Sequence, residues 1–146
     1  MRKLLAPALC IALLAPVGVA EAAKQRKYRG ALGEGTIVLK ATKKKVTKIT
    51  FGGFRLDCDD GDSLTYPGGS ASGARLSEKA FVFSGTNPDG WSTVEIDGVV
   101  RRKRAKGSFR MRVRFNEENK PDANGNVVCS TELGWKAKRV TKKKRG

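Results

Sequence analysis

Histidine is absent from this 146-residue chain, and cysteine, tryptophan and tyrosine are scarce, with three, two and two copies. Without an imidazole, the chain cannot form a Ser-His or Cys-His nucleophile pair, and it lacks the commonest metal ligand in proteins. Acidic residues are also few, since 14 Asp and Glu stand against 30 Lys and Arg, a formal charge of +16. We therefore expect no catalytic residues, no metal site and no cofactor.

Long apolar runs are missing except at the N-terminus. There a charged pair precedes an apolar stretch, Leu4 to Ala20, that is shorter than the roughly 20 residues a bilayer needs and is broken by prolines and a glycine. Ala20-Glu21-Ala22 then places small residues where a signal peptidase cleaves. This pattern predicts a signal peptide over residues 1–22, a β domain over 23–140 and a basic C-terminal tail over 141–146. We expect a secreted or envelope-associated protein with no integral membrane span after processing.

Cleavage at this site removes Cys10 and leaves two cysteines, Cys58 and Cys129. An even number of cysteines in an exported chain is typical of a disulfide, and two cysteines allow a single intramolecular pair. Because the loop between them is long, the chain-entropy treatment predicts roughly 4 kcal/mol of stabilisation from this bond. The mature domain keeps 28 basic and 13 acidic residues, so its formal charge is still +15.

Apolar and polar residues alternate through most of the mature chain, which indicates antiparallel strands joined by Gly-rich turns. Two hairpins are expected, 36–41 with 46–51 and 80–85 with 91–99, and a bulge is expected at Gly52-Gly53. The other expected segments are a strand at 105–115, strands at 127–131 and around Trp135, and loops at 59–73 and 116–126. The sequence thus predicts an all-β fold, a single antiparallel β-sandwich or barrel-like meander with one disulfide.

The few acidic residues match no catalytic or metal-binding pattern. Glu95 and Asp97 alternate with Val94 and Ile96, so both acids are expected to face water on one strand. The acids around Cys58 lack the glycine and the glutamate that an EF-hand loop needs at fixed positions, and they are typical of a polar turn. They are Asp57, Asp59, Asp60 and Asp62.

One face of the strand at 105–115 is apolar and the other is almost entirely basic. The basic side chains, which are the candidate binding residues, are Arg104, Lys106, Arg110, Arg112 and Arg114. Clustered cations bind anionic polymers by releasing counterions, and arginine suits bidentate contact with phosphate or carboxylate. Teichoic acid, an acidic glycan, extracellular nucleic acid or another cell-envelope component would fit such a face. The alternative is a solvated face that keeps a β protein from aggregating.

Two further functions remain open from the sequence. Trp91 lies beside a turn and Tyr66 lies in the Gly-rich segment, so these aromatic residues could stack on a sugar, whereas Trp135 is expected in the core. A structural envelope or matrix protein with no specific ligand would have the same composition.

Several Gly, aromatic and Cys spacings cover nearly all of the mature domain. They are Tyr28-Arg29-Gly30, FRLDCDDG at 54–61, FVFSG at 81–85, IDG at 96–98, AKGSFR at 105–110, and Cys129 with GWKA at 134–137. On these residues the chain resembles a group of small secreted two-cysteine β-domain proteins from high-GC Gram-positive bacteria. The resemblance implies a disulfide-linked β domain behind a signal peptide, and it transfers no catalytic residue.

Overall fold

A computed structural model describes residues 24–142, so the expected signal peptide and the last four residues of the tail lie outside the described residues. The described part of the chain contains no helix, and hence none that is long and apolar enough to cross a membrane. Its strands are β1 (Arg26–Leu32), β2 (Gly35–Ala41), β3 (Lys45–Gly52), β4 (Phe54–Cys58), β5 (Ser63–Tyr66), β6 (Gly69–Ala71), β7 (Ala74–Arg75), β8 (Ala80–Thr86), β9 (Ser92–Val100), β10 (Arg104–Phe115) and β11 (Val127–Arg139).

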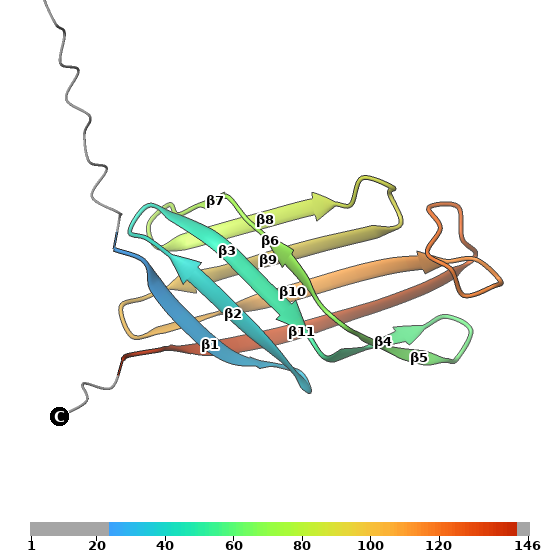
Figure 1. The fold of residues 1–146 in the computed structure, drawn as a ribbon, viewed down its shortest axis with the longest axis horizontal. Coiled ribbons are helices and arrows are strands. Elements are labelled where there is room, and N and C mark those ends of the chain that lie inside the picture. The colour runs from blue at the N-terminus through green and yellow to red at the C-terminus, as the bar shows by residue number, and fades with distance from the viewer. Residues whose placement is uncertain (1–23, 143–146) are drawn as a thin grey trace, which may run out of the picture.

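The strands form one antiparallel sheet that curls into a nearly closed barrel (Figure 1). The strand order along the sheet is β6-β3-β2-β1-β11-β10-β9-β8, with β4 and β5 joined through β11 and β7 joined to β3. A tight turn closed by reciprocal backbone hydrogen bonds between Ser77 and Ala80 leads from β7, which pairs with β3, directly into β8. The predicted all-β, antiparallel, barrel-like fold is confirmed.

Apolar side chains at alternate strand positions fill the inside of the barrel. On β10, Phe109, Met111 and Val113 are buried while the intervening residues face outward, as the sequence predicted. The rings of Phe51 and Phe54 pack edge-on against Phe109, with centroids 5.1 and 5.0 Å away. Trp135 is buried, as expected, and its indole N–H donates to the Ser108 carbonyl at 3.1 Å.

Both predicted hairpins are present, and local hydrogen bonds explain their turns. At the β2–β3 turn, the Thr42 hydroxyl accepts hydrogen bonds from the amides of Lys44 and Lys45. At the β8–β9 turn, the Asn87 side chain accepts from the Ser92 amide at 2.9 Å, and Gly90 takes the positive φ of 74° that favours glycine. The polar and glycine residues of both turns therefore supply the local hydrogen bonds and the positive φ that the sequence predicted.

Three details of the sequence prediction were wrong. Gly52-Gly53 is a break and not a bulge, because the chain bends at Gly53, with φ of 77°, and then leaves β2 to pair with β11 and β5. The segment 59–73 is not a continuous loop, because it contains β5 and β6. These two strands are short and carry no apolar run, so the sequence gives no strand signal for them. The two expected C-terminal strands are one continuous strand, β11, since Gly134 pairs in register with Ser108 and does not interrupt it.

Candidate functional site

The disulfide between Cys58 and Cys129 is present, and it crosslinks β4 to β11 at paired positions whose Cα atoms lie 3.9 Å apart. Only one further residue pair, Asp57 with Ser130, joins these two strands. The β4–β5 hairpin is therefore held to the barrel by one covalent bond, a short ladder, two hydrogen bonds between Asp59 and Val128, and the buried side chains of Phe54 and Leu56. The predicted pairing is confirmed.

The basic segments of the sequence gather at one end of the barrel (Figure 1). This end carries the start of β1, the β2–β3 turn with Lys43–Lys45, the β9–β10 connection at Arg101–Lys103 and the end of β11. Antiparallel pairing explains the convergence, because a strand that begins at one end lies beside a strand that finishes there. Segments near both ends of the described residues thus form one positive region.

On the outer face of the sheet, cross-strand pairing places these cations directly beside one another. Lys106 on β10 pairs with Lys136 on β11, and Arg104 pairs with Lys138, which also pairs with Arg29 on β1. A separate row crosses β1, β2 and β3, where Lys27 pairs with Lys40 and Lys40 pairs with Lys48. We call this surface the basic face; its exposed residues are Lys27, Arg29, Lys40, Lys48, Arg104, Lys106, Lys136 and Lys138.

The candidate residues on β10 fall into two groups with different surroundings. Arg104 and Lys106 belong to the basic face. Arg110, by contrast, lies 3.1 Å from Glu132 on β11 and 3.9 Å from Glu95 on β9, so two carboxylates flank its guanidinium group. Arg112 is exposed and Arg114 is half-buried. The five candidates therefore do not form one uniform basic stripe.

Arg112 and Arg114 pair mainly with neutral residues. Arg112 lies in register between Thr93 and Ser130, and Arg114 lies opposite Val128. Within residues 24–142, the ion pairs are Arg55–Asp57, Arg110 with Glu95 and Glu132, and Lys120–Glu118. None of these involves a residue of the basic face. The positive charge of this face is therefore not neutralised by the acids of the described domain.

A buried tyrosine holds the β9–β10 connection in place. The Tyr28 ring is completely buried beneath the sheet, and its hydroxyl donates a hydrogen bond to the Arg101 carbonyl at 2.7 Å. The Arg139 amide also donates to the Lys103 carbonyl at 2.9 Å. The backbone that carries three consecutive cations is thus fixed to β1 and β11.

A shallow depression of 710 Å³ adjoins the basic face on the outside of the barrel. Small outward residues, including Ala31, Ala80 and Gly134, line it, and Lys106 and Lys136 stand beside them. Asp97, whose carboxylate accepts a hydrogen bond from the Ser108 hydroxyl, also lines it. A flexible polymer could lie in this depression while its charges reach the two lysines.

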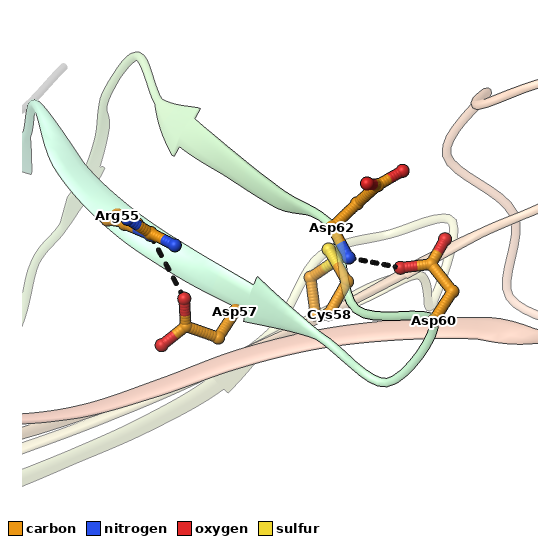
Figure 2. A network of polar contacts seen from close by, with 6 residues as sticks. Arg55, Asp57, Cys58, Asp60 and Asp62 are labelled. Atoms are coloured by element: carbon orange, nitrogen blue, oxygen red, sulfur yellow. Dashed lines mark hydrogen bonds and ion pairs between the residues drawn. A yellow bond between two sulfur atoms is a disulfide. The ribbon is translucent and has the colours of Figure 1, made fainter.

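The opposite end of the barrel has a different chemistry. It carries the acids of the β4–β5 turn, where Asp60 Oδ1 accepts from the Asp62 amide at 3.0 Å and Arg55 pairs with Asp57 at the same distance (Figure 2). A cavity of 660 Å³ opens beside this turn, and both Tyr66 and Trp91 line it. Burial raises the pKa of the Tyr66 hydroxyl, so this group stays protonated at neutral pH.

Of the eight residues of the basic face, the candidates selected from the sequence include only Arg104 and Lys106. Lys40 and Lys48 flank the β2–β3 turn, and Lys27 and Arg29 alternate with Tyr28 on β1, yet nothing in the sequence shows that β1 pairs with β11. The basic runs in the sequence could have predicted this surface, because an antiparallel meander brings such runs together at one end of the barrel. Glu95 and Asp97 face water as predicted.

Comparisons with protein-family models, curated proteins and solved structures found no match to this chain.

Proposed function

We propose that this chain is a secreted, non-catalytic binding domain that holds an anionic polymer on its basic face. One observation carries the proposal: cations from β1, β2, β3, β10 and β11 are aligned in cross-strand rows with no acidic partner among the described residues. A disulfide in a small β domain is compatible with an oxidising, extracellular location, which supports secretion.

The arrangement works against stability, which favours a functional origin over a merely solvated surface. Like charges directly opposite each other on neighbouring strands destabilise a sheet, and here they recur at Lys106 with Lys136 and at Arg104 with Lys138. Elsewhere on the same strands, Arg110 is flanked by two glutamates, so the fold also accommodates mixed charges. An unneutralised cluster is the arrangement that an anionic ligand would stabilise.

The spacing of the charges suits a polymer better than a single anion. Neighbouring strands lie about 4.8 Å apart, and outward residues along one strand are separated by about 7 Å. The basic face is therefore a two-dimensional array that can meet successive charges on a chain of phosphates or carboxylates. Teichoic acid, an acidic glycan and extracellular nucleic acid all present such repeats.

A matched pair of triple variants tests the proposal. Lys106→Gln, Lys136→Gln and Lys138→Gln remove three charges from the basic face, whereas Arg110→Gln, Arg112→Gln and Arg114→Gln remove three from the other half of β10. Binding of teichoic acid, polyphosphate, hyaluronan and single-stranded DNA is measured at several salt concentrations. We expect the lysine variant to weaken binding by more than tenfold and to lower the slope of log K against log salt by about 2, since each neutralised phosphate contributes about 0.7 to 0.9.

The arginine variant is the control, and we expect a smaller change because Arg110 already has carboxylate partners. Equal losses in the two variants would show that net charge alone drives binding. If the parent domain binds none of these polymers at moderate salt, the basic face has no polyanion ligand and a structural envelope role replaces this proposal. Circular dichroism and a thermal melt confirm that each variant is folded.

A further inference from the structure

The cavity at the disulfide end of the barrel has the composition of a ligand site. Its volume, 660 Å³, lies within the range of small-molecule pockets, which are lined mainly by apolar and aromatic side chains with a few polar groups. Here the apolar wall includes Leu64, Tyr66, Trp91 and Phe115. The polar groups are Asp60, Asp62, Ser63 and Asn119.

The walls of the cavity are held firmly by the fold. Cys58 and Cys129 both line it, so the disulfide fixes the β4–β5 hairpin against β11 at this point. Tyr66 stacks on Phe54 in the core, with ring centroids 5.6 Å apart, and so enters the cavity from a fixed position. On the other side, the Trp91 carbonyl accepts a hydrogen bond from the Arg114 amide at 2.8 Å. A preformed site of this kind loses little conformational entropy when a ligand binds.

Several polar groups of the wall have no partner within the described part of the chain. Neither the Trp91 indole N–H nor the Tyr66 hydroxyl forms a hydrogen bond there, in contrast to Trp135, whose N–H donates to the Ser108 carbonyl. The Asp62 carboxylate forms no ion pair, and the Asp60 carboxylate accepts only from the Asp62 amide (Figure 2). The cavity therefore offers both donors and acceptors beside aromatic surface.

We infer that this cavity binds a neutral, hydroxyl-rich ring, namely a sugar residue of a glycan. A hydroxyl group donates and accepts, so it can use the carboxylates of Asp60 and Asp62 as well as the N–H of Trp91. An ammonium group can only donate and would leave the indole unpaired, while a phosphate would meet the two carboxylates. The flat, apolar faces of a sugar ring pack on aromatic side chains. The cavity lies beside the β4–β5 turn. This turn is at the end of the barrel opposite the basic segments, so the site does not depend on the proposed polyanion binding (Figure 1).

The two tryptophans provide a direct readout. Trp135 is buried in the core, whereas Trp91 lines the cavity and is half-buried, so a ligand in the cavity changes the emission of Trp91. The probes are short neutral oligosaccharides of glucose, mannose, galactose and N-acetylglucosamine, titrated into the mature disulfide-bonded domain. We expect at least one of them to shift the fluorescence, and Trp91→Phe to abolish that signal.

Affinity is measured independently by calorimetry on three variants. Trp91→Ala should weaken binding by about tenfold, the factor that corresponds to the loss of one aromatic contact. Asp62→Asn should weaken it by a similar factor, since a hydrogen bond to a charged group is stronger than one to an amide. Asp89→Asn is the control, because Asp89 is exposed at the same end of the barrel and does not line the cavity.

Three results would overturn the inference. The first is that no neutral oligosaccharide alters the fluorescence or releases heat. The second is that Trp91→Ala and Asp62→Asn bind as tightly as the parent. The third is that an alkylammonium compound binds while the sugars do not. Asp62→Asn changes an exposed turn and leaves the core intact, so its result is interpretable even if Trp91→Ala unfolds the domain. Polyanion binding is measured separately, which distinguishes failure of this site from failure of the basic face.

Discussion

The two ends of the barrel are built from the same sheet but hold their loops in different ways. At the basic end, long ladders between β1, β11 and β10 and the Tyr28 hydrogen bond fix the connecting segments. At the other end, the β4–β5 hairpin is joined to β11 by two residue pairs, two hydrogen bonds between Asp59 and Val128, and the Cys58–Cys129 bond. The charge differs as well, since cations dominate one end and the Asp-rich turn lies at the other.

This difference shows how one small fold can keep two surfaces independent. The basic face lies on the outside of regular strands, where side chains can be substituted without disturbing the core. The cavity lies between a hairpin and loops, where the disulfide replaces the missing ladder. Perturbations of one end should therefore leave the other end unchanged, and the following predictions test that separation.

The largest effect is expected from removing the disulfide. The double variant Cys58→Ser, Cys129→Ser removes a crosslink between residues that are 71 positions apart in the sequence. The chain-entropy treatment predicts that this lowers the free energy of unfolding by about 4 kcal/mol. Urea denaturation of the variant, compared with the oxidised and the reduced parent, measures the loss.

Hydrogen exchange then shows where the structure loosens. We expect amides of β4 and β5 to lose protection first, while those of β10 and β11 stay protected, since local openings follow the weakest ladders. Earlier loss of protection in β1 and β10 would contradict the proposed difference between the two ends.

Sequence reasoning predicted the all-β fold, the disulfide and most strands because their signals are local: alternation, turn residues and an even number of cysteines. It missed β1 because the inward positions of that strand are Tyr28, Gly30 and Leu32, and glycine hides the apolar alternation. Gly30 is required there, since a Cβ atom at this position would collide with the Lys136 carbonyl oxygen of β11. Gly30 thus interrupts the apolar alternation at the same position where β1 and β11 approach each other closely.

The candidate sites were predictable only in part for a related reason. Tyr66 and Trp91 could be selected as exposed aromatic residues, but their shared cavity depends on a hairpin that folds back across the barrel end. Likewise, the alternation on β10 identifies its outward cations, whereas the glutamates beside Arg110 come from β9 and β11. Strand order is a tertiary property, and it decides which charges are neutralised.

A smaller effect is expected from Tyr28→Phe, which removes the hydroxyl and keeps the buried ring. The Arg101 carbonyl loses its partner, so we expect a loss of about 1 kcal/mol, or about 4 °C in the melting temperature. Amides of the β9–β10 connection should exchange faster, while those of β4 and β5 do not change. An equal loss of protection at both ends would show that the whole barrel, and not this connection, depends on the hydrogen bond.

The smallest predicted effect concerns charge, and it takes opposite signs in the two halves of β11. Lys136→Glu places a carboxylate directly opposite Lys106, so we expect a gain of about 0.5 kcal/mol, seen as a rise of about 2 °C in the melting temperature. Glu132→Lys, four residues earlier on the same face, removes the ion pair with Arg110 and should lower stability by a similar amount. Both residues are exposed and neither touches the core, so each effect should shrink at high salt, where surface charges are screened. If Lys136→Glu raises stability and at the same time weakens polyanion binding, the repulsion within the basic face is retained for binding. If it lowers stability instead, the cations on β10 and β11 do not repel each other as their pairing implies, and the argument for a functional cluster fails.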